Sequence, residues 1–199
     1  MMKKIIIVLS FLLLSACSTT YPAITEYRID APLNLPHEIK SSCSNHSLTV
    51  AQVFVPSTLM SKKMKYVVGE YEEFAYNESE WAQKPNRAIS DAIVKALQNA
   101  EIFQTVSSYK SFSHSDYTLE SRVEAFGQYF SEDEKSSFVK IEVTFSLIDN
   151  KTAQVLQVKH ITKTKKTQKA DAKSGVIALN ELLGKSLEEM VLWIGGSCK

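Results

Sequence analysis

The chain is short of glycine, proline and net charge. Six glycines and five prolines among 199 residues exclude collagen-like and low-complexity proteins. Lysine plus arginine (23) and aspartate plus glutamate (22) nearly cancel to +1, so the overall charge gives no reason to expect nucleic acid as a partner. Only one segment is long and apolar enough to be considered for a membrane span, which excludes a multi-span membrane protein. With 44% hydrophobic residues, the chain is sufficient for one folded core.

The sequence also lacks the short motifs of common enzymes. It contains no Gly-x-Ser-x-Gly, no glycine-rich phosphate loop and no His-Glu-x-x-His. Residues 113–116 read Ser-His-Ser-Asp, but a catalytic triad needs groups that converge from separate segments. Cys43 and His46 have no second cluster of cysteine or histidine to complete a metal site. We therefore expect no enzymatic activity, no metal and no cofactor.

The amino terminus has the features of a lipoprotein signal. Lys3 and Lys4 precede an apolar run over residues 5–14, which as a helix would span about 15 Å, half of a bilayer core. Such a run is typical of a signal peptide. Residues 14–17 read Leu-Ser-Ala-Cys, which resembles the bacterial lipobox, Leu-[Ala/Ser]-[Gly/Ala]-Cys. The resemblance implies a signal peptide over residues 1–16 and a lipid on Cys17; the alternative is a plain secretory signal with an unrelated cysteine.

The expected lipid also predicts a compartment. Two or three acyl chains hold a protein on a membrane almost permanently, and bacterial lipoproteins of this kind face the periplasm. Residue 18 is Ser and not Asp, which in enteric bacteria implies the outer membrane. We expect a lipid-anchored protein of the outer membrane, with its folded part in the periplasm.

Cys43 and Cys198 remain in the mature chain. Because exported proteins commonly form disulfides, these two cysteines are candidates for one. The bond would connect an early loop to the last turn and would contribute about 4 to 5 kcal/mol in the chain-entropy model. Two free thiols are the alternative.

The organisation of the chain follows from composition and periodicity. Residues 17–47 hold three of the five prolines and are predicted to be a lipidated tether, with a short first strand near residues 26–30. Residues 48–199 are predicted to form a single α+β domain. Strands are expected over residues 48–55, on both sides of Gly69, over 119–125 and 139–147, and over 154–165, which would pair back as a hairpin.

Two amphipathic helices complete the predicted domain. Apolar residues recur every three to four positions from Pro85, with Asn86 as candidate cap, to residue 100, and again from Asp171 to Gly195. The strict alternation over 139–147 and over 119–125, which places Ala125 on the buried face, favours an antiparallel sheet with one face in water. The predicted fold is α+β, an antiparallel β-sheet with two amphipathic α-helices packed on one face.

Residues 48–97 carry a recognisable arrangement. A strand that ends in Val-Phe-Val-Pro at residues 53–56 precedes two tyrosines, and Trp-Ala-x-x-Pro at residues 81–85 directly precedes the first helix. Upstream, residues 26–32 are similar to an opening Tyr-x-Leu strand. Together these features resemble the ABC-type transport auxiliary lipoproteins, which include the paraquat-inducible protein C lipoprotein, over residues 26–194. Arg28-Ile29 and the two later cysteines depart from the pattern.

The resemblance implies a function. Proteins of this family are associated with MCE-type lipid transport, so we expect a non-catalytic accessory subunit whose partners are an MCE-family protein and an ABC transporter complex. A homo-oligomer is also plausible, because the sheet exposes edges that can pair. The alternatives are a lipid-binding carrier and a structural lipoprotein of outer-membrane assembly.

Two sets of side chains are candidates for contacts with other molecules. Trp81, Tyr66 and Tyr76 are candidates for binding a partner, although a Trp before a helix also packs on that helix. Lys159, Lys163 and Lys165 would share one face of a strand, where they could contact anionic lipid head groups or an acidic partner. Alternatively, these lysines protect a sheet edge from pairing with other chains.

Overall fold

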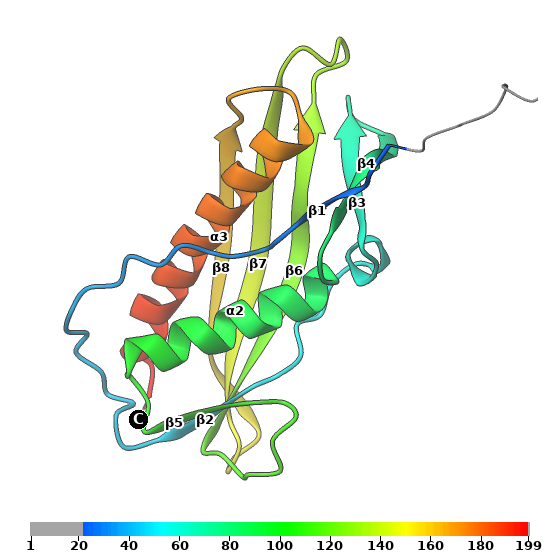
Figure 1. Ribbon diagram of the computed structural model, residues 1–199. Helices are drawn as coiled ribbons and strands as arrows, with labels where there is room; N and C mark the ends of the chain where they lie inside the picture. Colours follow the sequence, from blue (N-terminus) through cyan, green and yellow to red (C-terminus); the bar gives the residue numbers. More distant parts are fainter. Residues whose placement is uncertain (1–21, 199) are drawn as a thin grey trace, which may run out of the picture.

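A computed structural model describes residues 22–198, which form an eight-stranded sheet with two long helices on one face (Figure 1). The described elements are β1 (Thr25–Tyr27), β2 (Ser47–Val50), the 3-10 helix η2 (Ser57–Met60), β3 (Lys63–Val68), β4 (Glu72–Trp81), α2 (Pro85–Ala100), β5 (Thr105–Ser108), β6 (Tyr117–Phe130), β7 (Ser137–Asp149), β8 (Gln154–Lys166) and α3 (Ala172–Gly195). The expected signal peptide over residues 1–16 and the expected lipid site at Cys17 lie outside the described residues. No described helix combines the length and the apolar character that crossing a membrane requires.

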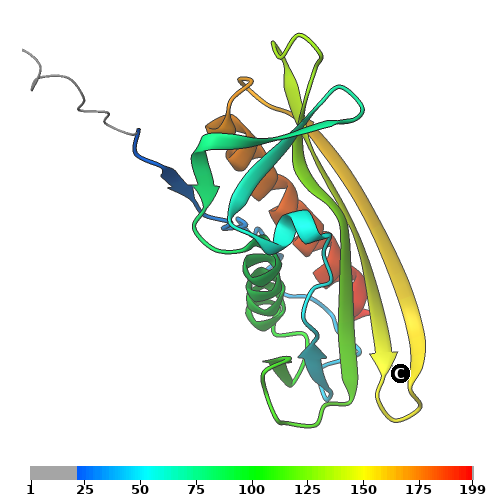
Figure 2. The same ribbon diagram turned by 90° about the vertical axis from the view of Figure 1, so that its right-hand side faces the viewer.

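One half of the sheet is a long antiparallel meander of β6, β7 and β8. In β7, every second residue from Ser137 to Leu147 is buried, which is the alternation predicted for residues 139–147. α3 contacts β7, and Figure 2 shows from the side that the helix lies along one face of the sheet. The meander is thus stabilised by local hairpins and by one continuous apolar face.

A β-bulge in β6 changes which residues face the core. The register with β7 shifts between Val123 and Ala125. Leu119 and Val123 are buried before the shift, and Phe126 is buried after it, whereas Ala125 is only half-buried. The expected burial of Ala125 is therefore wrong, because the extra residue of a bulge moves all later side chains to the other face.

The other half of the sheet contains parallel pairs. β1 is parallel to β4, β2 is parallel to both β5 and β6, and β3 is parallel to β6. The α+β class with two helices on one face is confirmed, but the sheet is mixed and not antiparallel throughout. Alternation reports which face of a strand is buried and carries no information about the direction of its neighbour, so the sequence pattern could not distinguish the two arrangements.

The two helices begin at different kinds of residue. α2 begins at Pro85, with Lys84 in the capping position, and the expected cap Asn86 lies instead inside the first turn with its side chain buried. α3 is capped by Asp171, whose carboxylate accepts a 2.7 Å hydrogen bond from the Ser174 amide. This hydrogen bond holds the pKa of Asp171 below its usual value.

Residues 28–43, called the strap here, differ from the expected tether because they pack on the folded body. The strap crosses α3 on the side away from the sheet (Figure 1). Asn180 of α3 accepts a hydrogen bond from the Asp30 amide and donates one to the carbonyl oxygen of Arg28, each at 3.0 Å. Gly184 permits this approach, because a Cβ there would collide with the carbonyl oxygen of Pro32. These polar contacts supply partners for a backbone that has no regular secondary structure.

Candidate functional site

The sheet opens into a fork on one edge of β6. β2 pairs with residues 117–119, a single bridge joins Phe54 to Arg122, and β3 pairs only from Gln128 to Phe130. Among the described residues, no strand pairs with β6 on this edge between Arg122 and Gln128. The β6 bulge lies in the same stretch, and it bends the strand where its neighbour is missing.

A cavity of about 230 Å³ occupies this fork, and we call it the fork cavity. It lies between β3, β4, β6, η2 and α3. Its apolar lining consists mainly of Leu59, Met64, Trp81, Phe126, Val176 and Leu179. Four charged residues, Lys63, Lys65, Glu73 and Glu124, also line it. The cavity therefore combines an apolar interior with charged groups of both signs.

Tyr76 and Gln128 connect the wall of the fork cavity to neighbouring elements through hydrogen bonds. The Tyr76 hydroxyl donates a 3.0 Å hydrogen bond to Oε1 of Gln128, and burial raises the pKa of Tyr76. Nε2 of Gln128 donates to the Ser137 hydroxyl at 2.9 Å and to the carbonyl oxygen of Asp171 at 3.1 Å. Gly175 of α3 leaves room for the Gln128 side chain, which a Cβ would displace. This network positions the cavity wall and leaves no amide group of Gln128 unpaired.

The three aromatic candidates for partner binding differ in how far they are buried. Trp81 has only 4% of its surface exposed and lies against Phe126, with ring centroids 5.9 Å apart. This burial favours the alternative of a Trp that packs in the core over a Trp that binds a partner. Tyr66 and Tyr76 are half-buried neighbours, with ring centroids 4.6 Å apart. Both line the fork cavity, so the structure brings all three residues to one site.

The three lysines of β8 lie on one strand face, as expected, and this face is covered by α3. Nζ of Lys159 and Nζ of Lys163 lie 2.9 and 2.7 Å from the Glu189 carboxylate, and Lys165 pairs with Glu181. The hydrogen bonds from Lys163 and Lys159 lower the pKa of Glu189. Because their charges are paired with α3, the lysines do not form a free cationic surface for lipid head groups. Inward-pointing charges on an edge strand support the alternative of edge protection.

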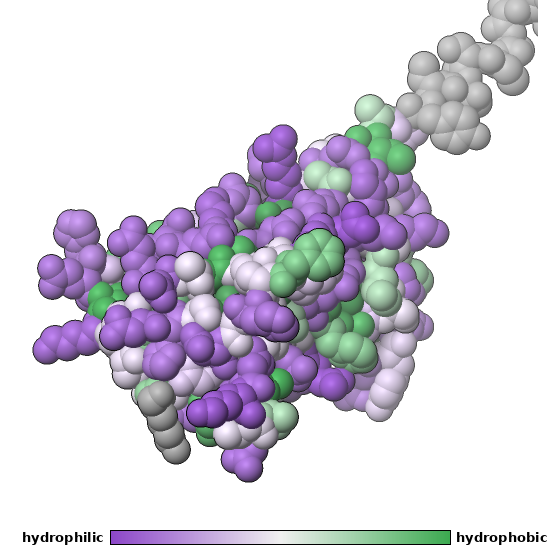
Figure 3. All heavy atoms as spheres, turned by 90° about the horizontal axis from the view of Figure 1, so that it is seen from below, coloured by the Kyte–Doolittle hydropathy of each residue, from purple (hydrophilic) through white to green (hydrophobic). Residues whose placement is uncertain are grey.

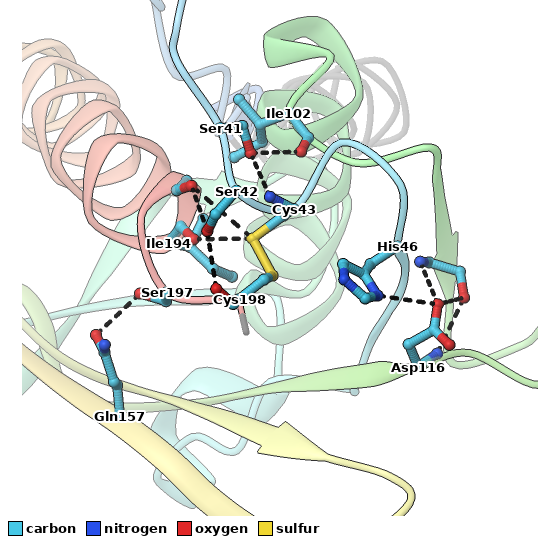
Figure 4. Close-up of a disulfide and its surroundings, with 12 residues drawn as sticks. Ser41, Ser42, Cys43, His46, Ile102, Asp116, Gln157, Ile194, Ser197 and Cys198 are labelled. Carbon is cyan, nitrogen blue, oxygen red and sulfur yellow. Dashed lines mark hydrogen bonds and ion pairs between the residues drawn. A yellow bond between two sulfur atoms is a disulfide. The ribbon is translucent and has the colours of Figure 1, made fainter.

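A disulfide joins Cys43 at the end of the strap to Cys198 (Figure 4). Both cysteines are buried. Beside the bond, the Ser42 amide donates a 2.9 Å hydrogen bond to the carbonyl oxygen of Gly195, and the Ser41 hydroxyl donates at 2.7 Å to the carbonyl oxygen of Ile102. The strap is thus connected covalently and by hydrogen bonds to the end of α3.

His46 and Asp116 meet at the start of β2, close to the disulfide (Figure 4). The Asp116 carboxylate accepts hydrogen bonds from the Ser47 amide and the Ser47 hydroxyl, both at 2.7 Å, and lies 3.8 Å from Nδ1 of His46. The bonds from Ser47 lower the pKa of Asp116. Because the Asp116 carboxylate is hydrogen-bonded to Ser47, the Ser-His-Ser-Asp segment connects the start of β2 to the start of β6. Within residues 22–198, no group of three or more cysteine, histidine or acidic side chains could hold a metal ion.

The end of the molecule that carries the β5–β6 and β7–β8 connections, at the bottom of Figure 1, is largely hydrophilic (Figure 3). Hydrophobic areas are scattered over this face and do not merge into one surface. Phe112 at the β5–β6 connection is fully exposed. Single exposed apolar residues are normal on a soluble surface, so this end does not compete with the fork cavity as a candidate site.

The fold and the site define a class of protein: an α+β body with a small cavity whose lining combines apolar and charged residues. The chain belongs to the family of ABC-type transport auxiliary lipoprotein components, whose model matches residues 27–191. The family is one of lipoproteins, which indicates membrane anchoring with a periplasmic face. Its name also indicates association with ABC transport.

Solved structures support the fold. Protein XCC0632 from Xanthomonas campestris is 19% identical, with a TM-score of 0.76 over 86% of this chain and 95% of that chain. A second structure, of an uncharacterized protein, is also 19% identical, with a TM-score of 0.64 over 85% of this chain and 99% of that chain. At this identity the likeness shows the fold alone. No curated protein matches the chain.

Sequence reasoning missed several residues that shape the site and the strap. Asn180, which holds the strap, and Gln128, which holds Tyr76, gave no periodic signal. Gly175 and Gly184 did carry one, since a glycine inside a helical pattern costs about 1 kcal/mol relative to alanine and so indicates a close approach. Reading these two glycines in that way would have predicted that another segment crosses α3.

Proposed function

We propose that this protein is a non-catalytic accessory subunit of an ABC/MCE-type lipid transport system, anchored to the outer membrane through Cys17. The observation that carries the proposal is the family match over residues 27–191, behind a lipobox at residues 14–17. The described body supports it, because its polar clusters are engaged in hydrogen bonds within the fold. In this role the body docks on the transport machinery while the lipid holds it at the membrane.

The strap limits how far the body reaches from its anchor. Because residues 28–43 are attached to α3, only the residues between Cys17 and β1 can act as a tether. Thr25 lies eight positions after Cys17, and at the extended limit of 3.3–3.6 Å per residue these eight steps span at most about 29 Å. In this proposal the β1 end of the body therefore stays close to the membrane.

The carrier alternative is supported by one observation, the fork cavity. Pockets for drug-sized ligands are typically about 300–1,000 Å³, and the fork cavity has about 230 Å³. A phospholipid with two acyl chains exceeds this volume. The size of the cavity thus favours the accessory subunit over a carrier that encloses a whole lipid.

The partner is tested by cross-linking the tagged full-length protein in the native envelope. We expect an MCE-family protein and ABC transporter subunits among the cross-linked proteins. A tagged, unrelated lipoprotein of the same membrane serves as the control for nonspecific capture. Cross-links only to a β-barrel protein of outer-membrane assembly would overturn the proposal and favour the third alternative.

The anchor is tested separately. Cells grown with labelled palmitate should incorporate the label into the wild-type protein and not into Cys17→Ser. Density fractionation should then place the labelled protein with the outer membrane. Equal labelling of the two proteins would contradict the anchor, and recovery with the inner membrane would contradict the compartment.

A further inference from the structure

We propose that the fork cavity binds the terminal segment of one acyl chain. The shape of the sheet provides the opening, because β3 separates from β6 below the Tyr66–Gln128 pair and leaves the β6 edge unpaired as far as Arg122 among the described residues. α3 closes the inner side through Val176 and Leu179. An apolar ligand can therefore enter between two strands and end against the helix.

The volume and the lining determine the class of ligand. An apolar cavity of about 150 Å³ stays dry and binds benzene, so a cavity of about 230 Å³ holds a somewhat larger apolar group. The side chains of Leu59, Met64 and Leu179 in its lining are unbranched at Cβ and adapt to a flexible guest. The end of a single acyl chain meets both conditions, and a complete lipid does not.

The charges at the fork cavity do not select a charged head group. Two lysines, Lys63 and Lys65, line the cavity together with two glutamates, Glu73 and Glu124. Lys65 is paired with Glu73, with Nζ and Oε1 2.5 Å apart. Because two positive and two negative groups cancel, binding depends on the apolar part of the ligand, and the head group stays outside.

Two sources can supply such a chain. One is a lipid that the transport system moves, and for this source the inference rests on the proposed function. The other is the lipid on the protein's own Cys17, since β1 begins eight residues later and pairs with β4 at Trp81, in the wall of the cavity. Both sources offer the same chemistry, and the experiment must separate them.

Photo-cross-linking of a lipid tests the site. The full-length protein is placed in vesicles of phosphatidylethanolamine and phosphatidylglycerol with a trace of phospholipid that carries a diazirine at the end of one acyl chain. After irradiation and digestion, mass spectrometry locates the label. We expect the label on peptides that contain Met64 and Trp81. Label found only outside the lining of the fork cavity overturns the proposal.

Two substitutions fill the cavity from opposite sides. Ala125→Leu narrows the opening at the half-buried β6 residue, and Val176→Phe occupies the floor. Each should reduce labelling of the Met64 and Trp81 peptides at least fivefold. The matched control is Ala51→Leu, at a half-buried alanine of the same sheet region outside the fork cavity. Unchanged labelling in both filled variants, with unfolding temperatures like that of the control, contradicts the site.

The Cys17→Ser variant separates the two sources. Because the variant also loses its anchor, labelling is compared per molecule of protein bound to the vesicles. If the protein's own lipid fills the cavity, removing this lipid should raise that ratio severalfold. If a transported lipid is the natural ligand, the ratio should stay the same. The vesicles contain no transporter, so this result is independent of the partner. If the cavity is labelled but cross-linking in the envelope finds no transporter subunit, only the proposed function is contradicted. If cross-linking finds the transporter but the cavity is not labelled, only the acyl-chain site is contradicted.

Discussion

The strap and β8 hold two flanks of α3 in different ways. The strap contacts Asn180 and Gly184 and ends in the disulfide at Cys43. β8 is a regular strand that pairs with β7 along its length and forms ion pairs with Glu181 and Glu189 of α3. The strap has no periodic sequence pattern, and individual contacts at a few residues hold it in place. β8 has a clear periodic pattern, and regular strand pairing and ion pairs hold it in place.

The difference shows that a segment far from its partner in sequence needs stronger contacts than a strand in a hairpin. A strand in a hairpin gains its neighbour through a short turn, so little entropy is lost when it pairs. The strap has to be held against α3, which lies about 150 residues later in the chain. Holding the strap in place therefore needs the Cys43–Cys198 disulfide and a glycine, Gly184, where the strap crosses the helix. We expect disruption of the strap contacts to cost more than disruption of the β8 ion pairs.

Removal of the disulfide should have the largest effect. The double variant Cys43→Ala/Cys198→Ala opens a loop between residues separated by 155 positions. In the chain-entropy model this lowers the free energy of unfolding by about 5 kcal/mol. Urea denaturation of the wild type and the variant, both without reductant, measures the difference. A loss below about 1 kcal/mol would show that the noncovalent contacts hold the strap by themselves.

Filling the crossing point should have the second largest effect. Gly184→Val places side-chain atoms where the carbonyl oxygen of Pro32 lies, and overpacking of this kind costs about 2–3 kcal/mol. Hydrogen exchange at the Asp30 amide should also become faster, because the strap lifts from Asn180. Gly196→Val is the matched control, since nothing lies within 4 Å of a Cβ at that position. Equal stability of the two variants would contradict the close crossing.

The smallest effect is expected for Glu189→Gln in the β8 contact. Partly exposed ion pairs contribute about 0–1 kcal/mol, and the loss should fall in this range at pH 7. The pKa of Glu189 is lowered in the folded state, so its contribution is present above the ordinary value of 4.5 and is lost as the pH falls through the folded value.

The pH dependence supplies the test of this third prediction. Thermal unfolding of wild type and Glu189→Gln should differ at pH 7 and converge at pH values well below 4.5. Glu120→Gln, at an exposed residue of β6, is the control for a general effect of charge. A difference between wild type and Glu189→Gln that grows in acid would contradict the sign of the linkage.

Much of the fold could be predicted from local patterns. The alternation in β7, the apolar seams of α2 and α3, and the hairpin between β7 and β8 all correspond to described elements. The lysines of β8 were correctly expected to share a face. Their pairing with Glu181 and Glu189 was not predicted, because the sequence does not show which helix covers that face.

The candidate site was predicted only in fragments. Tyr66, Tyr76 and Trp81 were predicted as candidates for binding a partner, and the structure places them around one cavity. The cavity depends on where β3 leaves β6, which is set by the pairing of segments about 60 residues apart, and on the β6 bulge, which is set by the register between β6 and β7. No local pattern reports such a distance, so the sequence could not reveal the cavity.

The amino-acid sequence alone indicated which faces of α2, α3 and β7 are buried, since side-chain periodicity follows directly from backbone geometry. It also indicated the expected anchor at Cys17 and the family resemblance. Only the tertiary structure decided the direction of the strands, the path of the strap over Gly184 and the opening at β6. These features depend on which distant segments meet, and the free energy of such contacts is settled by packing in three dimensions.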